Sequence, residues 1–211
     1  MKSVIISNGD ILDFDYFKNI LKDKFVICCD GAISHCIKMG IKPSIWVGDK
    51  DSCILEDSEF KSATCNCEII KLDPIKDMTD TEYAFDVAIQ KGCTDITLIG
   101  AFGGRFDHTL ANLYLIKKVS PVVQNVCIID KNNIIFPAKK HNVINKGDFK
   151  YVSIIPLSDE LLGVTTTGLY YKLSNETLKK YTSRGVSNEM TDNEAVIDIT
   201  DGDAVIILSK D

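Results

Sequence analysis

The stretch Thr79–Lys118, TDTEYAFDVAIQKGCTDITLIGAFGGRFDHTLANLYLIKK, predicts a helix, a buried strand and a second helix in succession. Thr79 stands three residues before Glu82, which is the spacing of an N-terminal capping box, and Gly92 is placed to end the first helix. The apolar face of this helix consists of Ala84, Phe85, Ala88 and Ile89. The run DITLIG at 95–100 is mostly apolar, as in a strand that is covered on both faces.

The second helix is expected at residues 106–118, where Lys117 and Lys118 occupy the last turn and favour the helix dipole. The side chains at helical spacing along it are Leu110, Leu113, Tyr114 and Lys117. Further apolar runs alternate with helix-like stretches, so that strands are predicted at 2–7, 24–29, 44–48, 67–72, 95–100 and 122–130. This βαβ pattern predicts an α/β fold with a doubly wound, mostly parallel sheet.

The pattern changes after about residue 135. Runs rich in β-branched residues, FKYVSIIPL, GVTTTGLYYKL, EAVIDIT and DAVIILSK, are separated by Gly, Pro, Asn and Asp, with one short basic helix or loop near 175–180. They predict a smaller antiparallel β-sandwich or barrel, so we divide the chain into domains at 1–132 and 133–211. A β domain this small is marginal alone, so we expect it to lean on its neighbour or on a dimer partner.

The composition excludes several classes of protein. With 211 residues, 45% of them hydrophobic and 26% charged, the chain has the composition of an ordinary globular protein. The net charge of −6 and the dispersed lysines argue against nucleic-acid binding. No apolar run is long enough for a membrane span, and the N-terminus does not have the pattern of a signal peptide, so we expect a cytoplasmic protein without a membrane partner. The eight cysteines lack a repeated C-x-x-C spacing, which favours reduced thiols over a disulfide framework or a zinc site.

Doubly wound sheets bind ligands at the carboxyl ends of their strands, so the residues that follow each apolar run form the candidate site. Polar side chains follow five of the runs, namely Asn8, Asp30, Asp49, Asp51, Asp77, Asp80, Arg105, Asp107 and His108. Asp49 and Asp51 flank Lys50, so in an extended chain both carboxylates point to one side and the lysine to the other. Such a pair indicates either an acid/base pair or a shared cation.

The loop GAFGGRFDH at 100–108 is the most specific local signal. Its glycines permit close approach of backbone to phosphate beside a helix N-terminus, Arg105 is a bidentate phosphate donor, and Asp107 is a further carboxylate. The loop lacks the GK[ST] of a P-loop, and no GxGxxG follows the first strand. Acidic loops that face a phosphate require a divalent cation between them, which predicts Mg²⁺ and a phosphoryl-type transfer.

The combination of G-D-x-D-S at 48–52, D-x-T-D at 77–80 and G-G-R-x-D-H at 103–108 resembles the bacterial-type thiamine pyrophosphokinases. The segments that carry the resemblance, in order, are CDGAISHCIKMGIKPSIWVGDKDS, KDMTDTEYAFDVAIQKGCTDITLIGAFGGRFDHTLANLYL, SIIPLSDELLGVTTTGLYYKL and RGVSNEM. The resemblance implies transfer of the pyrophosphoryl group of ATP to the hydroxyl of thiamine, giving thiamine diphosphate and AMP, in a homodimer. It also implies that residues 1–132 bind ATP and metal, and that 133–211 contribute thiamine binding and dimer contacts.

Specific residues match the motifs of that family. The implied catalytic and Mg²⁺-binding cluster consists of Asp49, Asp51, Asp80 and Asp107. The implied ATP site consists of Thr79 and Arg105, beside which we expect Asp77, Gly103 and Gly104. Asp30 is expected near thiamine and the reacting groups, while Ser187 and Asn188 match a pair that faces thiamine from the partner subunit. The resemblance therefore places the active site at the subunit interface.

The chain departs from the family pattern at two places, and two other functions stay open. The family usually reads D-G-G-A-N where this chain reads DGAIS at 30–34, and the middle of G-D-x-D is often apolar where Lys50 stands. We expect Lys50 to face away from the carboxylates and to have little effect. The first alternative function is a Mg²⁺-dependent phosphohydrolase in which Asp49 is the nucleophile. The second is a non-catalytic nucleotide-binding regulator whose acidic cluster only binds metal.

Overall fold

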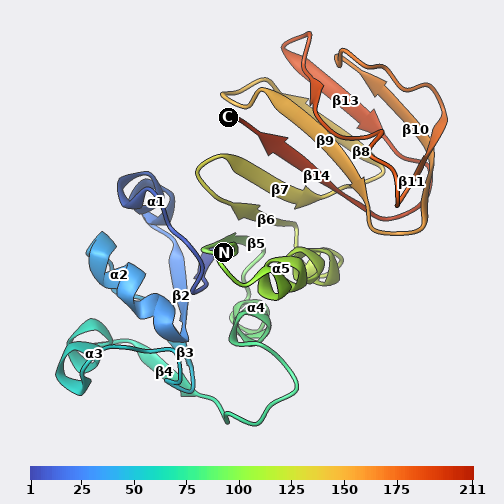
Figure 1. Ribbon diagram of the computed structural model, residues 1–211. Helices are drawn as coiled ribbons and strands as arrows, with labels where there is room; N and C mark the ends of the chain where they lie inside the picture. Colours follow the sequence, from blue (N-terminus) through green and yellow to red (C-terminus); the bar gives the residue numbers. More distant parts are fainter. The chain divides into compact units, whose positions relative to one another are not determined.

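The computed structural model describes residues 1–211, which separate into two compact units, 1–131 and 132–211 (Figure 1). The first unit contains a parallel sheet with helices, and the strands of the second unit pair antiparallel. The predicted fold class, α/β with a smaller antiparallel β unit, is confirmed. None of the helices combines the length and the apolar character that crossing a membrane requires.

The sheet of the first unit has the strand order β6-β5-β1-β2-β3-β4, and all neighbouring strands are parallel. Its strands are β1 (Lys2–Ile6), β2 (Phe25–Cys29), β3 (Ile45–Gly48), β4 (Glu68–Lys71), β5 (Asp95–Ile99) and β6 (Asn125–Ile129). Each of them lies inside one of the predicted apolar runs. The strand order reverses at β1, between β2 and β5, and doubly wound sheets bind ligands at such a switch point.

Helices cover both faces of this sheet, with α1 to α3 on one side and α4 and α5 on the other (Figure 1). Their bounds, with one short 3-10 turn, are α1 (Phe14–Leu21), η1 (Asp30–Ala32), α2 (Ile33–Met39), α3 (Asp57–Ala63), α4 (Asp80–Gln90) and α5 (Phe106–Val119). The largest side chains sealed between the layers include Trp46, Phe17, Phe85 and Leu98. Each contributes about 1.5–3 kcal/mol by leaving water, so the core holds the strand ends rigidly in register.

Helix α4 begins as predicted, but its capping box is only half formed. The Glu82 N–H donates to the Thr79 hydroxyl at 3.2 Å. The Glu82 carboxylate pairs instead with Lys118 of α5, at 2.6 Å. Gly92, two residues beyond the helix, has the positive φ of +77° that ends many helices. The polar cap therefore fixes where α4 begins, and a bond between α4 and α5 replaces the second half of the box.

The buried face of α5 differs from the side chains that stand at the predicted spacing. Leu110 and Tyr114 are 44% and 51% exposed. The buried side chains of the helix are Asn112, Leu115, Ile116 and Val119. The helix thus carries two sets of side chains at helical spacing. Packing against α4 and β6 buries the set that contains Leu115, Ile116 and Val119. Periodicity alone identifies the helix but does not decide between such stripes.

The second unit consists of two antiparallel sheets with the strand orders β12-β9-β14-β7 and β11-β10-β13-β8. The strands are β7 (Asn133–Pro137), β8 (His141–Asn145), β9 (Tyr151–Pro156), β10 (Glu160–Thr167), β11 (Glu176–Lys179), β12 (Asn188–Glu189), β13 (Glu194–Asp198) and β14 (Ala204–Ser209). Apolar side chains of both sheets form one core cluster, as in a β-sandwich. The expected helix or loop near 175–180 is wrong, because residues 176–179 form β11 and bury Leu178 against β10.

Candidate functional site

The loops at the carboxyl ends of β1 and β5 are joined by backbone hydrogen bonds. Gly9 N donates to Gly100 O at 2.8 Å, and Asp10 N donates to Phe102 O at 2.6 Å. Gly100 has a φ of +63°, and a side chain at this position would stand 2.3 Å from the Ser7 carbonyl oxygen. Both the positive φ and the close approach require glycine at position 100. Gly100 is therefore the glycine of the GAFGGR loop that no other residue can replace without strain.

Asp30 follows β2 and organises the chain that leaves β3. Its residue surface is only 4% exposed. Its carboxylate accepts hydrogen bonds from Lys50 N at 2.8 Å and from Ser52 N at 2.9 Å. Its carbonyl oxygen accepts from Trp46 Nε1 at 3.0 Å. A Cβ on Gly48 would lie 2.8 Å from the Asp30 side chain, so glycine at the end of β3 makes room for this carboxylate.

The prediction that Asp49 and Asp51 face one side because the chain is extended is wrong in its cause. β3 ends at Gly48, and Lys50 has a φ of +71°, so the chain turns here. The Asp51 N–H donates to Asp49 Oδ1 at 3.1 Å and closes the turn. Ligand oxygens of Asp30, Asp49 and Asp51 nevertheless lie within 4.8 Å of one another. A turn built around Asp30, not strand alternation, brings these carboxylates together.

The side chain of Lys50 lies away from this group. Its ammonium pairs with Asp57 at 3.0 Å and stands 4.2 Å from the centroid of the Phe60 ring. Its backbone, however, donates to Asp30 and adopts the left-handed conformation that the turn needs. The residue therefore matters to the site through its main chain.

Lys76, which the sequence reasoning did not single out, lies inside the acidic group. Its Nζ is 2.9 Å from Asp49 Oδ2 and 3.1 Å from Asp80 Oδ1. Asp80 Oδ1 is buried, and the Lys76 ammonium is its charged partner. The signal that could have found it is the one cation in the loop DPIKDMTD, four residues before Asp80.

The carboxyl groups of the site titrate in different directions. The hydrogen bond from Lys76 lowers the pKa of Asp49 below its usual range. Burial raises the pKa of Asp30 and of Asp80, against the hydrogen bonds that Asp30 accepts and the ammonium beside Asp80. Burial alone would lower the pKa of Lys76, but pairing with Asp49 and Asp80 raises it. Together, these carboxylates carry more negative charge than the single ammonium of Lys76 neutralises.

Arg105 and Asp107 pair with each other. Arg105 donates to Asp107 through Nε at 3.3 Å and through one terminal nitrogen at 2.6 Å. These hydrogen bonds lower the pKa of Asp107 to about 2. Both side chains are well exposed, 73% for Arg105 and 64% for Asp107. The structure thus brings Asp30, Asp49 and Asp51 together and links Asp49 to Asp80 through Lys76, while Asp107 stands with its arginine at the start of α5.

The other predicted residues of this edge occupy the loops before the two helices. Thr79 caps α4 and Asp77 is exposed. Gly104 has open space where a side chain would stand, and a Cβ on Gly103 would lie 3.3 Å from Gly9. The remaining two residues, Asn8, whose amide lies against Gly31, and the exposed His108, complete the set.

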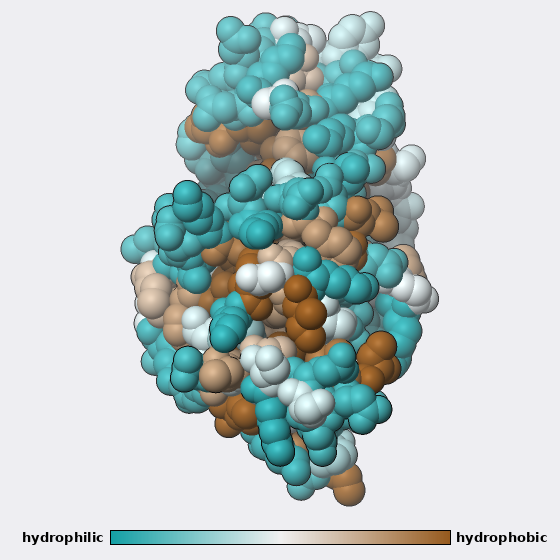
Figure 2. Space-filling view, turned by 90° about the vertical axis from the view of Figure 1, so that its left-hand side faces the viewer, coloured by the Kyte–Doolittle hydropathy of each residue, from teal (hydrophilic) through white to brown (hydrophobic).

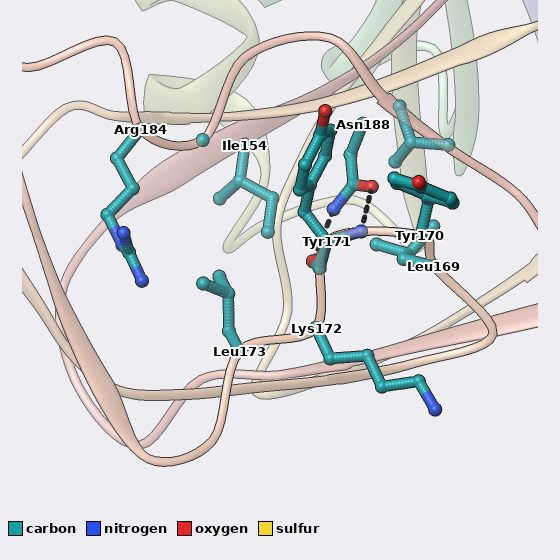
Figure 3. A pocket seen from close by; sticks show the side chains of 10 residues that line it. Ile154, Leu169, Tyr170, Tyr171, Lys172, Leu173, Arg184 and Asn188 are labelled. Carbon is teal, nitrogen blue, oxygen red and sulfur yellow. Dashed lines mark hydrogen bonds between the residues drawn. The ribbon is translucent and has the colours of Figure 1, made fainter.

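The second unit has a pocket of ≈ 340 Å³ beside Asn188. Asn188 Oδ1 accepts from Tyr171 N at 2.9 Å, and its Nδ2 donates to Tyr171 O at 2.7 Å. Figure 3 shows Ile154 and Leu173 between Arg184 on one side and the tyrosines on the other. Ser187 is exposed, has a φ of +58° and donates its N–H to Ser153 Oγ. An apolar floor with aromatic walls and a few fixed polar groups is the usual form of a small-molecule pocket.

A second hollow of ≈ 520 Å³ lies between α2 and α3. On this face, hydrophobic patches lie among hydrophilic side chains (Figure 2). Its lining includes Gly40, Ile41 and Lys42, which precede β3 and so belong to the amino-terminal edge of the sheet. The switch-point rule does not place a ligand at that edge.

The acidic group fits a hard divalent cation. Its donors are carboxylate oxygens, which Mg²⁺ prefers, and three of them lie within 4.8 Å. Asp80 adds a buried oxygen whose charged partner is the Lys76 ammonium. Residues Asp30, Asp49, Asp51 and Asp80 could therefore hold the ion.

Comparison with known proteins identifies both units. Residues 17–128 match the family model of the thiamin pyrophosphokinase catalytic domain, and 140–203 match that of the thiamin pyrophosphokinase vitamin B1 binding domain. The thiamine pyrophosphokinase of Bacillus subtilis is 30% identical over 174 residues, which cover 82% of this chain and 81% of that protein. Thiamin pyrophosphokinase 1 of Caenorhabditis elegans is 27% identical, over 83% and 75% of the two chains.

Comparison with solved structures supports the same family. The crystal structure of the thiamine pyrophosphokinase from Bacillus subtilis superposes over 100% of both chains with a TM-score of 0.90 and 28% identity. That of the thiamin pyrophosphokinase from Geobacillus thermodenitrificans has a TM-score of 0.88 and 26% identity over 100% and 98%. These matches favour a kinase over the phosphohydrolase and the non-catalytic regulator. With catalytic and vitamin-binding domains both matched, the chain belongs to the thiamine pyrophosphokinase family.

Proposed function

We propose that this enzyme transfers the pyrophosphoryl group of ATP to the hydroxyl of thiamine and releases thiamine diphosphate and AMP. The observation that carries the proposal is the convergence of Asp30, Asp49 and Asp51 within 4.8 Å, with Asp80 joined to them through Lys76, in a chain of this family. An acidic edge accepts a polyphosphate only through a divalent cation, because bare carboxylates and phosphates repel.

Mg²⁺ is the proposed cofactor, held by Asp49, Asp51 and Asp80. The ion would neutralise negative charge on the phosphates during the transfer. Asp30 shapes the turn that carries Asp49 and Asp51, and its own carboxylate belongs to the group. Asp107 is proposed as a fourth catalytic carboxylate, and it would reach the ion only after release from Arg105, which holds it now.

The proposed ATP site surrounds the start of α4 and α5. Arg105 is an exposed guanidinium at the N-terminus of α5, where a helix favours anions, and it can bind phosphate in two-pronged fashion. The open space at Gly104 supports close approach of a phosphate to the backbone. The residues proposed to line this site with Arg105 are Asp77, Thr79, Gly103 and Gly104.

Thiamine is proposed to bind Ser187 and Asn188, with Asp30 near the reacting hydroxyl. The pocket beside Asn188 supports this, since its aromatic walls suit a flat heterocycle. We further propose a homodimer in which Ser187 and Asn188 reach the thiamine bound to the partner subunit. A cytoplasmic location is also proposed, because all eight cysteines are free thiols, as expected in a reducing compartment.

The product assay tests the proposal. Purified enzyme with ATP, Mg²⁺ and thiamine should yield AMP and thiamine diphosphate in equal amounts. Asp49→Asn should lose turnover while its circular dichroism stays that of the wild type. ADP or inorganic phosphate as the nucleotide-derived product would overturn the reaction that we propose.

A further inference from the structure

Lys76 occupies the place where two carboxylates of the proposed metal site meet. Its ammonium touches Asp49 Oδ2 at 2.9 Å and Asp80 Oδ1 at 3.1 Å. The Asp49 side chain is 5% exposed and that of Asp80 is 19% exposed, so water shields these oxygens little. Without Lys76, these two little-exposed carboxylates would lie near each other with no cation between them.

The lysine belongs to a long exposed loop between β4 and α4, which runs out from the body of the first unit (Figure 1). Ile75, next to it, is 92% exposed and Met78 is 37% exposed. Asp73 bonds only within the loop, to Ile75 N through its carboxylate and to Lys76 through its carbonyl oxygen. Within residues 73–78, the ion pairs of Lys76 are thus the polar bonds that reach the rest of the unit, and they fasten the loop to the site.

An ammonium and a divalent ion compete for these oxygens. Mg²⁺ binds carboxylate oxygens at ~2.0–2.1 Å, whereas the ammonium nitrogen keeps a distance near 3 Å, so either cation excludes the other from the gap between two carboxylates. The positive charges of the ammonium and the metal ion would also repel each other at such a short distance. The lysine has a flexible four-carbon stem, and a polyphosphate arriving with the metal offers its ammonium new anionic partners.

We propose that Lys76 is an exchangeable counter-ion: it pairs with Asp49 and Asp80 in the free enzyme, is displaced from them by the metal, and then pairs with the polyphosphate of ATP. The lysine is then a positioning residue for the free site and a substrate-binding residue in the loaded one. This inference rests on the proposed metal site, because the exchange requires that Asp49 and Asp80 bind the ion.

Mn²⁺ binding to the free protein, without nucleotide, tests the exchange. Mn²⁺ suits the same oxygen donors and its unbound fraction is measured by electron paramagnetic resonance. Lys76→Met should bind Mn²⁺ about 10-fold more tightly than the wild type, since the metal no longer displaces a charged hydrogen bond. Lys76→Arg, which keeps the charge, should stay near the wild type. Unchanged or weaker binding by Lys76→Met would overturn the exchange.

Two further variants separate this result from its alternatives. Lys50→Met removes a neighbouring ammonium that pairs with Asp57 instead, and it should leave Mn²⁺ affinity unchanged; an equal gain would reduce the effect to net charge and overturn the proposal. Asp49→Asn should weaken Mn²⁺ binding. If wild type and Asp49→Asn bind Mn²⁺ equally poorly, the proposed metal site itself fails, which is a different result from a failure of Lys76→Met alone.

Kinetics test the loaded state. At saturating Mg²⁺, Lys76→Met should raise the KM for ATP about 10-fold, because a charged hydrogen bond to the polyphosphate is lost, while the KM for thiamine stays within twofold. Without metal, the melting temperature of Lys76→Met should fall below that of the wild type, because two little-exposed carboxylates lose their counter-ion. An unchanged KM for ATP would overturn the proposed contact with the polyphosphate.

Discussion

The backbone N–H of Lys50 donates to the carboxylate of Asp30 at 2.8 Å, which ties the turn after β3 to the end of β2. Because Asp30 also accepts from Ser52 N, one buried carboxylate fixes both ends of the turn that carries Asp49 and Asp51. The position of these two carboxylates therefore depends on a residue from another strand.

Asp30→Ala should lower the free energy of unfolding by about 1–3 kcal/mol, because two part-buried backbone N–H groups lose their charged acceptor. Asp30→Asn retains one acceptor oxygen, so its free energy of unfolding should lie between those of the wild type and Asp30→Ala. Urea unfolding followed by circular dichroism measures both, and activity should fall in the same order. A wild-type unfolding midpoint for Asp30→Ala would show that the turn is held by something else.

Gly100→Ala should destabilise the protein by about 3 kcal/mol or more, since alanine at φ +63° is strained and its Cβ would overlap the Ser7 carbonyl oxygen. Gly104→Ala is the matched variant in the same loop. It has open space, so its stability should stay within about 0.5 kcal/mol of the wild type. If a phosphate approaches that space, Gly104→Ala raises the KM for ATP alone. Equal unfolding curves for the two variants would contradict the difference between these glycines.

The elements of the first unit could be predicted from sequence because each strand is a short apolar run between polar loops, and because Thr79 marks the start of α4. The geometry of the acidic group could not. The two carboxylates were expected to share a side through strand alternation, yet β3 ends at Gly48 and a left-handed Lys50 turns the chain. That turn depends on Asp30, a tertiary contact that no local pattern of residues 48–52 contains.

Lys76 and α5 show the same limit in different ways. Lys76 was visible as a lone cation near Asp80, but its meeting with Asp49 joins residues 27 positions apart. On α5, leucine and tyrosine at helical spacing marked the helix correctly, yet Asn112 is buried and Tyr114 exposed. Asn112 is tolerated inside because its amide donates to the Ala101 carbonyl at 2.8 Å, a partner that lies in the preceding loop.

Thiol reactivity should follow burial. Cys65 is exposed and should be alkylated first by iodoacetamide at pH 8. Cys28 and Cys29 are buried, and burial raises the pKa of each thiol, so they should react only after unfolding. Cys67 should react at an intermediate rate, because burial raises the pKa of its thiol to about 11. Peptide mass spectrometry over a time course gives the order, with urea-unfolded protein as the control. Early labelling of Cys28 in the folded protein would contradict the packing of the core.

Asn188 should affect thiamine and not ATP. Its side chain fixes the backbone of Tyr171 at the wall of the pocket through two hydrogen bonds. Asn188→Ala frees that wall, but Tyr171 is 65% exposed, so water replaces the lost bonds and the stability cost should stay within about 1 kcal/mol. The KM for thiamine should rise several-fold at an unchanged KM for ATP.

Asn193→Ala is the matched control for Asn188→Ala, since it removes an exposed asparagine of the same unit that does not line the pocket. It should leave both KM values unchanged. Steady-state kinetics with each substrate varied in turn separates the outcomes. A rise in both KM values for Asn188→Ala would indicate a general loss of structure, and no rise in either would remove Asn188 from the thiamine site. The same pair of bonds that shapes the pocket should contribute little to stability, so the effect on thiamine binding can be measured in a folded variant.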